Sequence, residues 1–204
     1  MIYKKSWKYI LKKNNSYFCK TNFYYLQALK NFSNVSENEI GGYVDNYHNL
    51  SQTGNCWIYD NALVKEDAKV LENAKVSGNA VIFGDALVCG NAQISEKAIV
   101  KENAKIFDNV QVRDRAVVYG NALISENAFI SEYSHVFGYA RVYGNARIYG
   151  HVSVGAFAEV SGNAEVFENA LVAGFAKVSG NVKITKSAEV YEDIKLSGNI
   201  IVKK

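Results

Sequence analysis

The chain has 204 residues, 49% of them hydrophobic and 21% charged, and a formal net charge of +3. This composition is that of an ordinary folded protein, and it excludes a disordered chain and an acidic mimic of nucleic acid. The three cysteines, Cys19, Cys56 and Cys89, have neither CxxC nor Cys/His spacing, so we expect no disulfide framework, metal site or cofactor. No apolar run reaches the roughly 18 residues of a membrane span, and we expect a cytoplasmic protein that binds no membrane.

Residues 1–39 are expected to form a small N-terminal β cap. The short aromatic-rich segments SWKYILKK, NSYFCK and FYYLQALKNF are separated by Asn-containing turns, which is typical of a hairpin and a strand. A helix over residues 24–31 is the alternative. A cap is expected because an uncovered end of a strand stack invites pairing with another chain. Residues 40–57 are expected to form an irregular entry coil, into which Gly41 and Gly42 turn the chain.

Residues 58–204 are dominated by a repeat of six residues. A branched aliphatic residue recurs at 25 consecutive positions from Ile58 to Val202, with no insertion or deletion. A small residue, usually Ala, stands two positions before each, so the hexad reads A-x-V-x-G-N. Asp or Glu sometimes replaces the Gly, as at Glu96, Glu102, Asp108 and Glu126, where we expect solvated turn residues.

This period is that of a β structure and not of a helix, in which inward positions recur at a spacing of 3.6. In the alternation Ala-x-Val, both named residues lie on one side of a strand, while Gly and Asn tolerate the positive φ of a corner. Three such sides close a triangular coil of 18 residues. About eight coils stacked about 4.8 Å apart would form a prism. The larger interior residues Val182, Ile194 and Ile200 are expected to close its C-terminal end.

The hexad resembles the repeat of left-handed parallel β-helices, a family known best from trimeric acyltransferases. More closely, IGGYVDNYHNLSQTGNCWIYDNALV (residues 40–64), followed by hexads of the GNA type, resembles uncharacterised bacterial and prophage β-helix proteins, some of them labelled hexapeptide transferases. The resemblance covers residues 40–204. It implies an all-β, single-stranded parallel β-helix and supplies the left hand, which spacing does not show.

The repeat of 18 residues divides the surface into columns. One corner is asparagine throughout, from Asn55 to Asn199, and is expected to form a ladder of amide hydrogen bonds. The other two corners lose their turn residues in the middle coils, where Lys97, Arg115, Tyr133 and His151 follow one another in one, and Tyr139, Phe157 and Phe175 in the other.

One side of the prism carries an outward aliphatic column. Its members are Leu63, Val81, Ile99 and Val117, and Phe83, Tyr119 and Phe137 stand beside them. A contiguous apolar surface marks an interface. We expect the N-terminal segment or a second subunit to cover it, and a foreign partner is the alternative.

Cationic residues are unevenly distributed along the chain. All four arginines lie between residues 113 and 147, together with many of the tyrosines, and Arg and Tyr are enriched in binding hot spots. The alternative is that they decorate a solvated β surface. The predicted partner-binding residues are Arg113, Arg115, Tyr119, Tyr133, His135, Phe137, Tyr139, Arg141, Tyr143, Arg147, Tyr149, His151 and Phe157.

Three classes of function remain. The first is a rigid, non-catalytic β-helix that binds a protein partner, in concrete form a phage protein that blocks a host factor such as a defence nuclease. The second is a trimeric acyltransferase with His135 or His151 as general base, but the hexads contain no excursion loop to form a pocket. The third is a nucleic-acid-binding module, in which arginines contact phosphates and tyrosines stack on bases.

Overall fold

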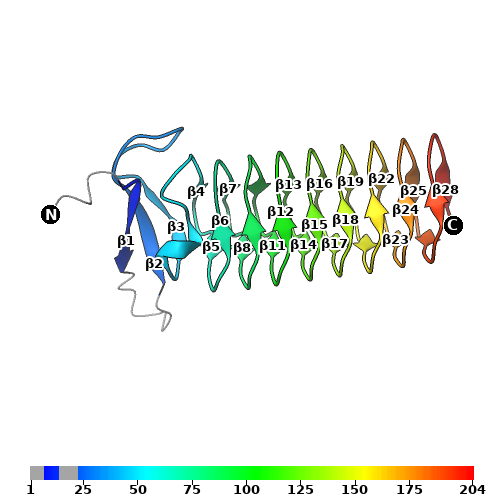
Figure 1. Ribbon diagram of the computed structural model, residues 1–204, viewed down its shortest axis with the longest axis horizontal. Helices are drawn as coiled ribbons and strands as arrows, with labels where there is room; N and C mark the ends of the chain where they lie inside the picture. Colours follow the sequence, from blue (N-terminus) through cyan, green and yellow to red (C-terminus); the bar gives the residue numbers. More distant parts are fainter. Residues whose placement is uncertain (1–6, 14–22) are drawn as a thin grey trace.

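The computed structural model describes residues 7–13 and 23–204, which form a long prism of stacked coils with a β cap at its N-terminal end (Figure 1). Three sheets form its sides, and a 3₁₀ turn, η2 (Tyr47–Asn49), lies in the entry coil. The predicted fold class, an all-β parallel β-helix of 18-residue coils, is confirmed.

Each side of the prism is one sheet. Face 1 has 11 strands: β1 (Tyr9–Lys13), β2 (Tyr24–Ala28), β3 (Ile40–Val44), β5 (Leu63–Val64), β8 (Val81–Ile82), β11 (Ile99–Val100), β14 (Val117–Val118), β17 (His135–Val136), β20 (Ser153–Val154), β23 (Leu171–Val172) and β26 (Glu189–Val190). Face 2 has eight strands: β6 (Lys69–Val70), β9 (Leu87–Val88), β12 (Lys105–Ile106), β15 (Leu123–Ile124), β18 (Arg141–Val142), β21 (Glu159–Val160), β24 (Lys177–Val178) and β27 (Lys195–Leu196). Face 3 has nine: β4 (Trp57–Ile58), β7 (Lys75–Val76), β10 (Gln93–Ile94), β13 (Gln111–Val112), β16 (Phe129–Ile130), β19 (Arg147–Ile148), β22 (Glu165–Val166), β25 (Lys183–Thr185) and β28 (Ile201–Lys203).

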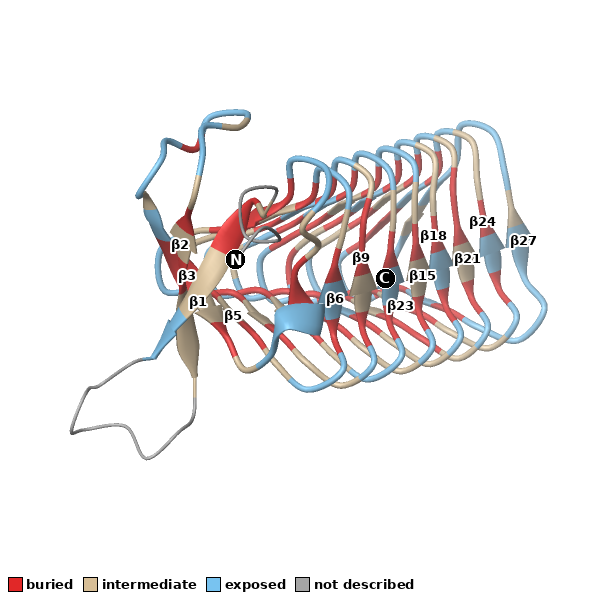
Figure 2. Ribbon diagram, turned by 60° about the vertical axis from the view of Figure 1, so that its left-hand side comes forward, coloured by how far each residue is buried: buried red, intermediate tan, exposed pale blue. Residues whose placement is uncertain are grey.

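The hexad residues take the places that the alternation predicts. In the middle coils the Ala and the branched residue are fully buried, as Ala98 and Val100 are, while the residues between them face outward (Figure 2). Neighbouring strands pair in parallel with partners 18 residues apart, such as Val100 with Val118. Each coil buries three such pairs, so the core is a continuous column stabilised by stacking.

The Gly position of the hexad has a positive φ at every corner where it is filled by Gly, Asp or Glu. Gly84 has a φ of +73°, and a Cβ there would lie 2.8 Å from the backbone nitrogen of Glu102. Glu102 itself has a φ of 60°, and its carboxylate accepts a hydrogen bond of 3.0 Å from the backbone N–H of Gly120, in the next coil. Such carboxylates therefore bind the corner of the next coil, whereas the sequence analysis expected them only to be solvated.

The asparagines of the corner between faces 2 and 3 lie in the turns, as expected, but they have no positive φ, which belongs instead to the preceding residue of each corner. Their amides form the predicted ladder: each Nδ2 donates to the Oδ1 of the asparagine one coil on, at 2.8–3.2 Å, from Asn55 to Asn199. Their role is to join successive coils along the prism.

The N-terminal cap continues face 1 beyond the first coil. Strands β1, β2 and β3 pair antiparallel, and β3 joins β5 in parallel through Tyr43 and Leu63. The β interpretation is confirmed, and the alternative helix over 24–31 is wrong because its first half is β2. The NSYFCK segment, including Cys19, lies outside the described residues.

Two buried residues of the cap close the N-terminal end of the core. The Lys8 ammonium donates to the carbonyl of Cys56 at 2.9 Å and lies 5.1 Å from the centroid of the Phe32 ring. Tyr9 is fully buried, and its hydroxyl donates to the carbonyl of Leu50. Lys8 thereby satisfies carbonyl groups of the entry coil that have no preceding coil to accept from.

Gly41 and Gly42 lie inside β3 and do not form the turn that was expected. A Cβ at Gly41 would lie 2.7 Å from the Trp57 ring, and one at Gly42 would lie 2.5 Å from the carbonyl oxygen of Ala62. The two glycines are required because the strand passes very close to the first coil.

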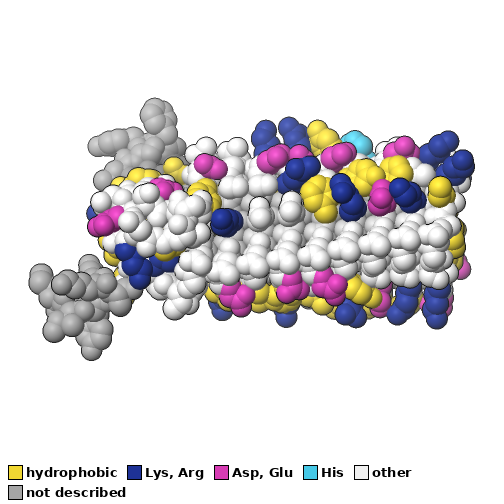
Figure 3. Space-filling model, turned by 90° about the horizontal axis from the view of Figure 1, so that it is seen from above, with side chains coloured by type: hydrophobic (Ala, Val, Ile, Leu, Met, Phe, Trp, Pro, Cys, Tyr) yellow, Lys and Arg dark blue, Asp and Glu magenta, His cyan; other side chains and the backbone are white. Residues whose placement is uncertain are grey.

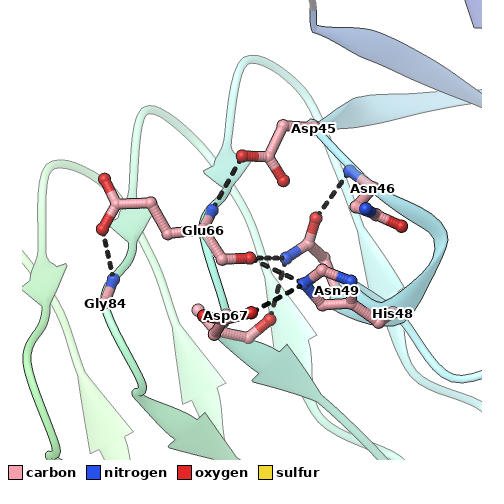
Figure 4. A network of polar contacts seen from close by, with 8 residues as sticks. Asp45, Asn46, His48, Asn49, Glu66, Asp67 and Gly84 are labelled. Carbon is pink, nitrogen blue, oxygen red and sulfur yellow. Dashed lines mark hydrogen bonds and ion pairs between the residues drawn. The ribbon is translucent and has the colours of Figure 1, made fainter.

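Polar side chains join the entry coil to the first regular coil (Figure 4). The Asn49 amide donates to the carbonyls of Glu66 and Ala68 at 2.8 and 2.9 Å, and Asp45 accepts from the Glu66 N–H at 2.8 Å. Glu66 in turn accepts from the N–H of Gly84, at 3.0 Å. The irregular segment is thus fixed to the same ladder of coils that follows it.

The C-terminal end of the core is open, contrary to expectation. Val182 is buried, but the interior residues Ile194 and Ile200 of the last coil are 42% and 39% exposed.

The described part of the N-terminal segment does not cover the apolar column of face 1. It extends the sheet edge to edge, so Leu63, Val81, Ile99 and Val117 remain half-buried on the outer surface.

Candidate binding surfaces

The structure distributes the thirteen predicted partner-binding residues over all three sides of the prism. Face 1 carries Tyr119, His135 and Phe137, and face 2 carries Arg141 and Tyr143. The corner between these faces carries Tyr139 and Phe157. The remaining six lie on face 3 and on the corner between faces 3 and 1: Arg113, Arg115, Tyr133, Arg147, Tyr149 and His151. A single flat partner could therefore contact only part of the set.

The largest group lies on face 3 and on the corner between faces 3 and 1, spans three consecutive coils and includes Phe129, which the sequence analysis did not select. We call it the Arg–aromatic surface, and its residues are Arg113, Arg115, Phe129, Tyr133, Arg147, Tyr149 and His151. Phe129 was missed because it replaces an ordinary outward residue of the hexad and lies beside no other aromatic in the sequence. On the side of the prism drawn in Figure 3, Lys and Arg side chains lie next to hydrophobic ones over the middle and C-terminal coils.

Two arginines share the ring of Phe129. The guanidinium carbon of Arg113 lies 4.8 Å from the ring centroid and that of Arg147 lies 5.0 Å from it. Because Arg113 precedes Phe129 by one coil and Arg147 follows it by one, the three side chains form a short stack along the prism. Cation–π contact of this kind holds a guanidinium in place and leaves its in-plane N–H groups open to a ligand.

A second stack follows the corner between faces 3 and 1. The Arg115 guanidinium lies 5.6 Å from the centroid of Tyr133, and Tyr133 stacks on His151 at 4.8 Å with the planes 8° apart. The side chains of Arg115 and Tyr133 also line an open groove of about 550 Å³ that continues past Lys97.

Carboxylates accompany these cations without neutralising all of them. Arg113 forms an ion pair with Asp114, at 3.7 Å from Nε to Oδ2. A hydrogen bond with Asp114, and then its charge, raise the pKa of Glu96 at the edge of the groove. Within the described ranges, Arg115 and Arg147 have no carboxylate at ion-pair distance. Two of the three arginines therefore keep their donors for another molecule.

The corner between faces 1 and 2 carries an exposed aromatic ladder. Tyr139, Phe157 and Phe175 stack with centroids 5.1 and 5.0 Å apart and planes 6° and 7° apart. They are 56%, 49% and 56% exposed. Phe175 belongs to this ladder but was not selected, because it lies outside the stretch that contains the arginines. The rings cover one another's faces, so the ladder presents ring edges as an apolar ridge.

The remaining predicted residues form smaller groups. On face 1 the Tyr119 ring stacks on Phe137 at 5.2 Å and contacts His135 edge-on at 6.3 Å. On face 2 the Arg141 guanidinium lies 5.7 Å from the centroid of Tyr143. This pair lies on a different side of the prism from the Arg–aromatic surface.

The two histidines considered as general bases have aromatic neighbours. His151 stacks on Tyr133 and His135 contacts Tyr119, and neither forms a hydrogen bond with a carboxylate among the described residues. An acyltransferase base needs a partner that orients its ring and a pocket that holds the acyl donor. Neither histidine has a carboxylate partner of this kind in the described part of the chain.

Two other classes of site can be compared with the structure. Among residues 7–13 and 23–204, no group of three His, Cys, Asp or Glu side chains is placed to hold a metal ion. No helix of the same residues is long and apolar enough to cross a membrane.

One family model matches a short part of the chain. Residues 140–155 match the family model described as the YdcK beta solenoid repeat. A search of curated proteins finds no match to the chain. The matched segment contains Arg141, Tyr143 and Arg147 as outward residues of a solenoid repeat, so the comparison supports the repeat architecture and carries no activity.

Proposed function

We propose that this protein is a rigid, non-catalytic β-solenoid that binds an acidic protein partner through its Arg–aromatic surface. The observation that carries the proposal is the placement of Arg113 and Arg147 against the ring of Phe129. The nearby pair of Arg115 and Tyr133 adds a third arginine to the same side.

Stacked arginines suit the recognition of carboxylates. A guanidinium that lies against a ring has already lost much of its rotamer entropy, so binding costs less ordering. Its N–H groups fit a carboxylate bidentately. The adjacent Tyr133, Tyr149 and His151 would add amphipathic contact area of the kind found in hot spots.

The scaffold supports this use. Every outward residue of the surface lies one position from a fully buried residue of a coil, as Arg147 lies beside Ile148 and Tyr133 beside Ser134. Parallel strand pairing fixes the strand of Arg147 on both sides. The surface is thus presented without rearrangement, as in rigid complexes. The resemblance to prophage β-helix proteins gives the proposal a concrete form: a phage-encoded cytoplasmic protein that blocks a host factor such as a defence nuclease.

The test compares arginines on different sides of the same prism. The triple variant Arg113→Ala, Arg115→Ala and Arg147→Ala removes the cations of the surface. The variant Arg141→Ala removes the fourth arginine, on face 2, and is the matched control. A partner captured from host extract on the wild-type protein, and identified by mass spectrometry, is purified and its Kd measured for each variant.

We expect the triple variant to lose roughly 30-fold or more in affinity, the equivalent of one hot spot of about 2 kcal/mol. The control variant should bind as the wild type does, and the melting temperatures should match. Equal affinity of the triple variant would disprove the proposal. A steep loss of binding with salt on single-stranded RNA or DNA, abolished in the triple variant, would replace the protein partner by a nucleic acid.

A further inference from the structure

The last coil ends in three open sheet edges. Strands β26, β27 and β28 are the terminal strands of faces 1, 2 and 3, and each pairs on one side only. The carbonyls of Ile194 and Leu196 accept from the preceding coil, at Lys177 and Ser179. The N–H and C=O groups of the alternate residue, Lys195, therefore point away from the prism.

Apolar side chains gather at the same end. Tyr191 and Ile201 are 47% and 66% exposed on the outer surface of the last coil, and the interior residues Ile194 and Ile200 are exposed at its open end. Unpaired strands with apolar side chains are a template for association with another chain. Lys8 and Tyr9 close the N-terminal end of the core, whereas the described residues provide no such closure at this end.

A second copy of the chain fits these edges because of how a coil rises. The three sides of a coil share the rise of one strand spacing, so each face of the last coil stands about a third of that spacing higher than the one before, in the order β26, β27, β28. A two-fold axis through the middle of face 2 places β27 against β27 of the partner copy and β26 against β28. The low edge of face 1 then meets the high edge of face 3. The distance between paired terminal strands of the two copies is therefore the same on all three faces, and all three pairs can lie one strand spacing apart.

An axis through either other face does not give this fit. The distances between paired strands would then be unequal, because the lowest edge, β26, would meet β26 of the partner copy, or the highest edge, β28, would meet β28. All three pairs formed about the axis through face 2 are antiparallel, and inward residues oppose inward ones.

Charge selects the register. The two β27 strands can pair in two registers that keep inward residues opposite inward ones near the middle of face 2. One is centred on Lys195 and the other on Leu196. The first places two Lys195 ammonium groups opposite each other, which is unfavourable. The second places Leu196 opposite Leu196, Glu189 opposite Lys203, and Tyr191 opposite Ile201. It thus combines an ion pair with two apolar pairs.

We propose that two copies of the 204-residue chain associate end to end through the last coil, in the register centred on Leu196. The contact continues the core of one prism into the other, with Val190 of each copy opposite Val202 of its partner. The Arg–aromatic surface lies in the middle coils and stays accessible in both copies.

The oligomeric state tests the contact. Sedimentation equilibrium should give twice the chain mass of 22.6 kDa. Glu189→Lys and Lys203→Glu should each shift the protein to monomer, and the double variant should restore the dimer because the ion pair is reversed. Lys177→Glu, in strand β24 of face 2, one coil before the contact, is the control and should stay dimeric.

Monomer at every concentration would overturn the proposal. So would a dimer that withstands both charge reversals. A dimer lost on Ile99→Glu but kept in Glu189→Lys would move the contact to the apolar column of face 1 and would also overturn it.

Cysteine cross-linking tests the register. With Cys19 and Cys89 replaced by Ser, Leu196→Cys should form a disulfide-linked dimer under mild oxidation, because the two-fold axis places this residue opposite itself. Lys195→Cys should form little. The opposite result would overturn the register centred on Leu196.

Discussion

The ring of Phe137 occupies the space above Gly155, where a Cβ would lie 2.4 Å from its Cζ atom. The same ring stacks on Tyr119 with the planes 12° apart. Gly155 has no positive φ, so its place in the repeat is explained by this ring and not by backbone conformation.

Gly155→Ala should therefore displace the Phe137 ring and destabilise the fold by about 1 kcal/mol, the value of a lost aromatic stack. In the background of Phe137→Ala the same substitution should be neutral or stabilising, because alanine is favoured over glycine in a strand. Urea unfolding of the four proteins in this cycle measures the coupling. Additive effects would contradict the contact.

The asparagine ladder predicts a difference between its middle and its end. Asn127 accepts from Asn109 and donates to Asn145, whereas Asn199 only accepts, from Asn181. Asn127→Ala should cost about 1–2 kcal/mol and Asn199→Ala about half as much, at roughly 0.5–1 kcal/mol per exposed hydrogen bond. Unfolding free energies check this, and equal losses would show that the ladder contributes little.

The corner carboxylates predict an unusual order of stability at Asp108. This residue has a φ of 57°, and its carboxylate accepts from the N–H of Glu126 at 2.9 Å. Asp108→Gly loses the hydrogen bond but relieves the backbone, so it should lie within about 0.5 kcal/mol of the wild type. Asp108→Ala loses the bond without that relief and should cost about 1–2 kcal/mol. Melting temperatures that rank Ala above Gly would contradict this explanation.

Cys89 predicts a pH dependence. Burial on face 2, and then the charges of Glu72 and Asp108, raise the pKa of its thiol from 9.0 to about 11. The folded protein thus holds a proton that the unfolded chain releases, so this contribution to stability is complete below pH 9 and is lost as the pH rises through 11. In a Cys19→Ser protein, the rate of Cys89 alkylation should rise with an inflection near 11. An inflection near 9 would contradict the raised pKa.

The repeat carried most of the fold prediction because its signal is local and redundant. Each hexad alone predicts that Ala and the branched residue face inward, as Ala98 and Val100 do. Because the 25 copies follow one another without insertion or deletion, they also determine which residues pair between coils. The segments that break the hexad were harder. Gly41 and Gly42 have the appearance of a turn, and only the approach of Trp57 and Ala62 shows why they lie in a strand.

The candidate site could be predicted less well, because a stretch of sequence passes around all three sides of a prism. Arg141 and Arg147 are six residues apart and lie on different faces, whereas Arg113 and Arg147 are far apart in sequence and share the ring of Phe129. Enrichment along the chain therefore located the right coils but not the side of each residue. The columns of the repeat could have separated them, and they would also have grouped Phe175 with Phe157.

The spacing of 18 residues between hydrogen-bonded asparagines means that each coil of the prism contains the same number of residues. Removing one full coil of 18 residues from the middle should give a shorter protein in which every remaining side chain stays on the same face or corner of the prism. Removing a single hexad instead would turn the downstream half by one face, so that ladder asparagines would meet the aromatic corner. The length of the protein can therefore change only by whole coils. Any shorter insertion or deletion changes which side chains lie on each face of the prism.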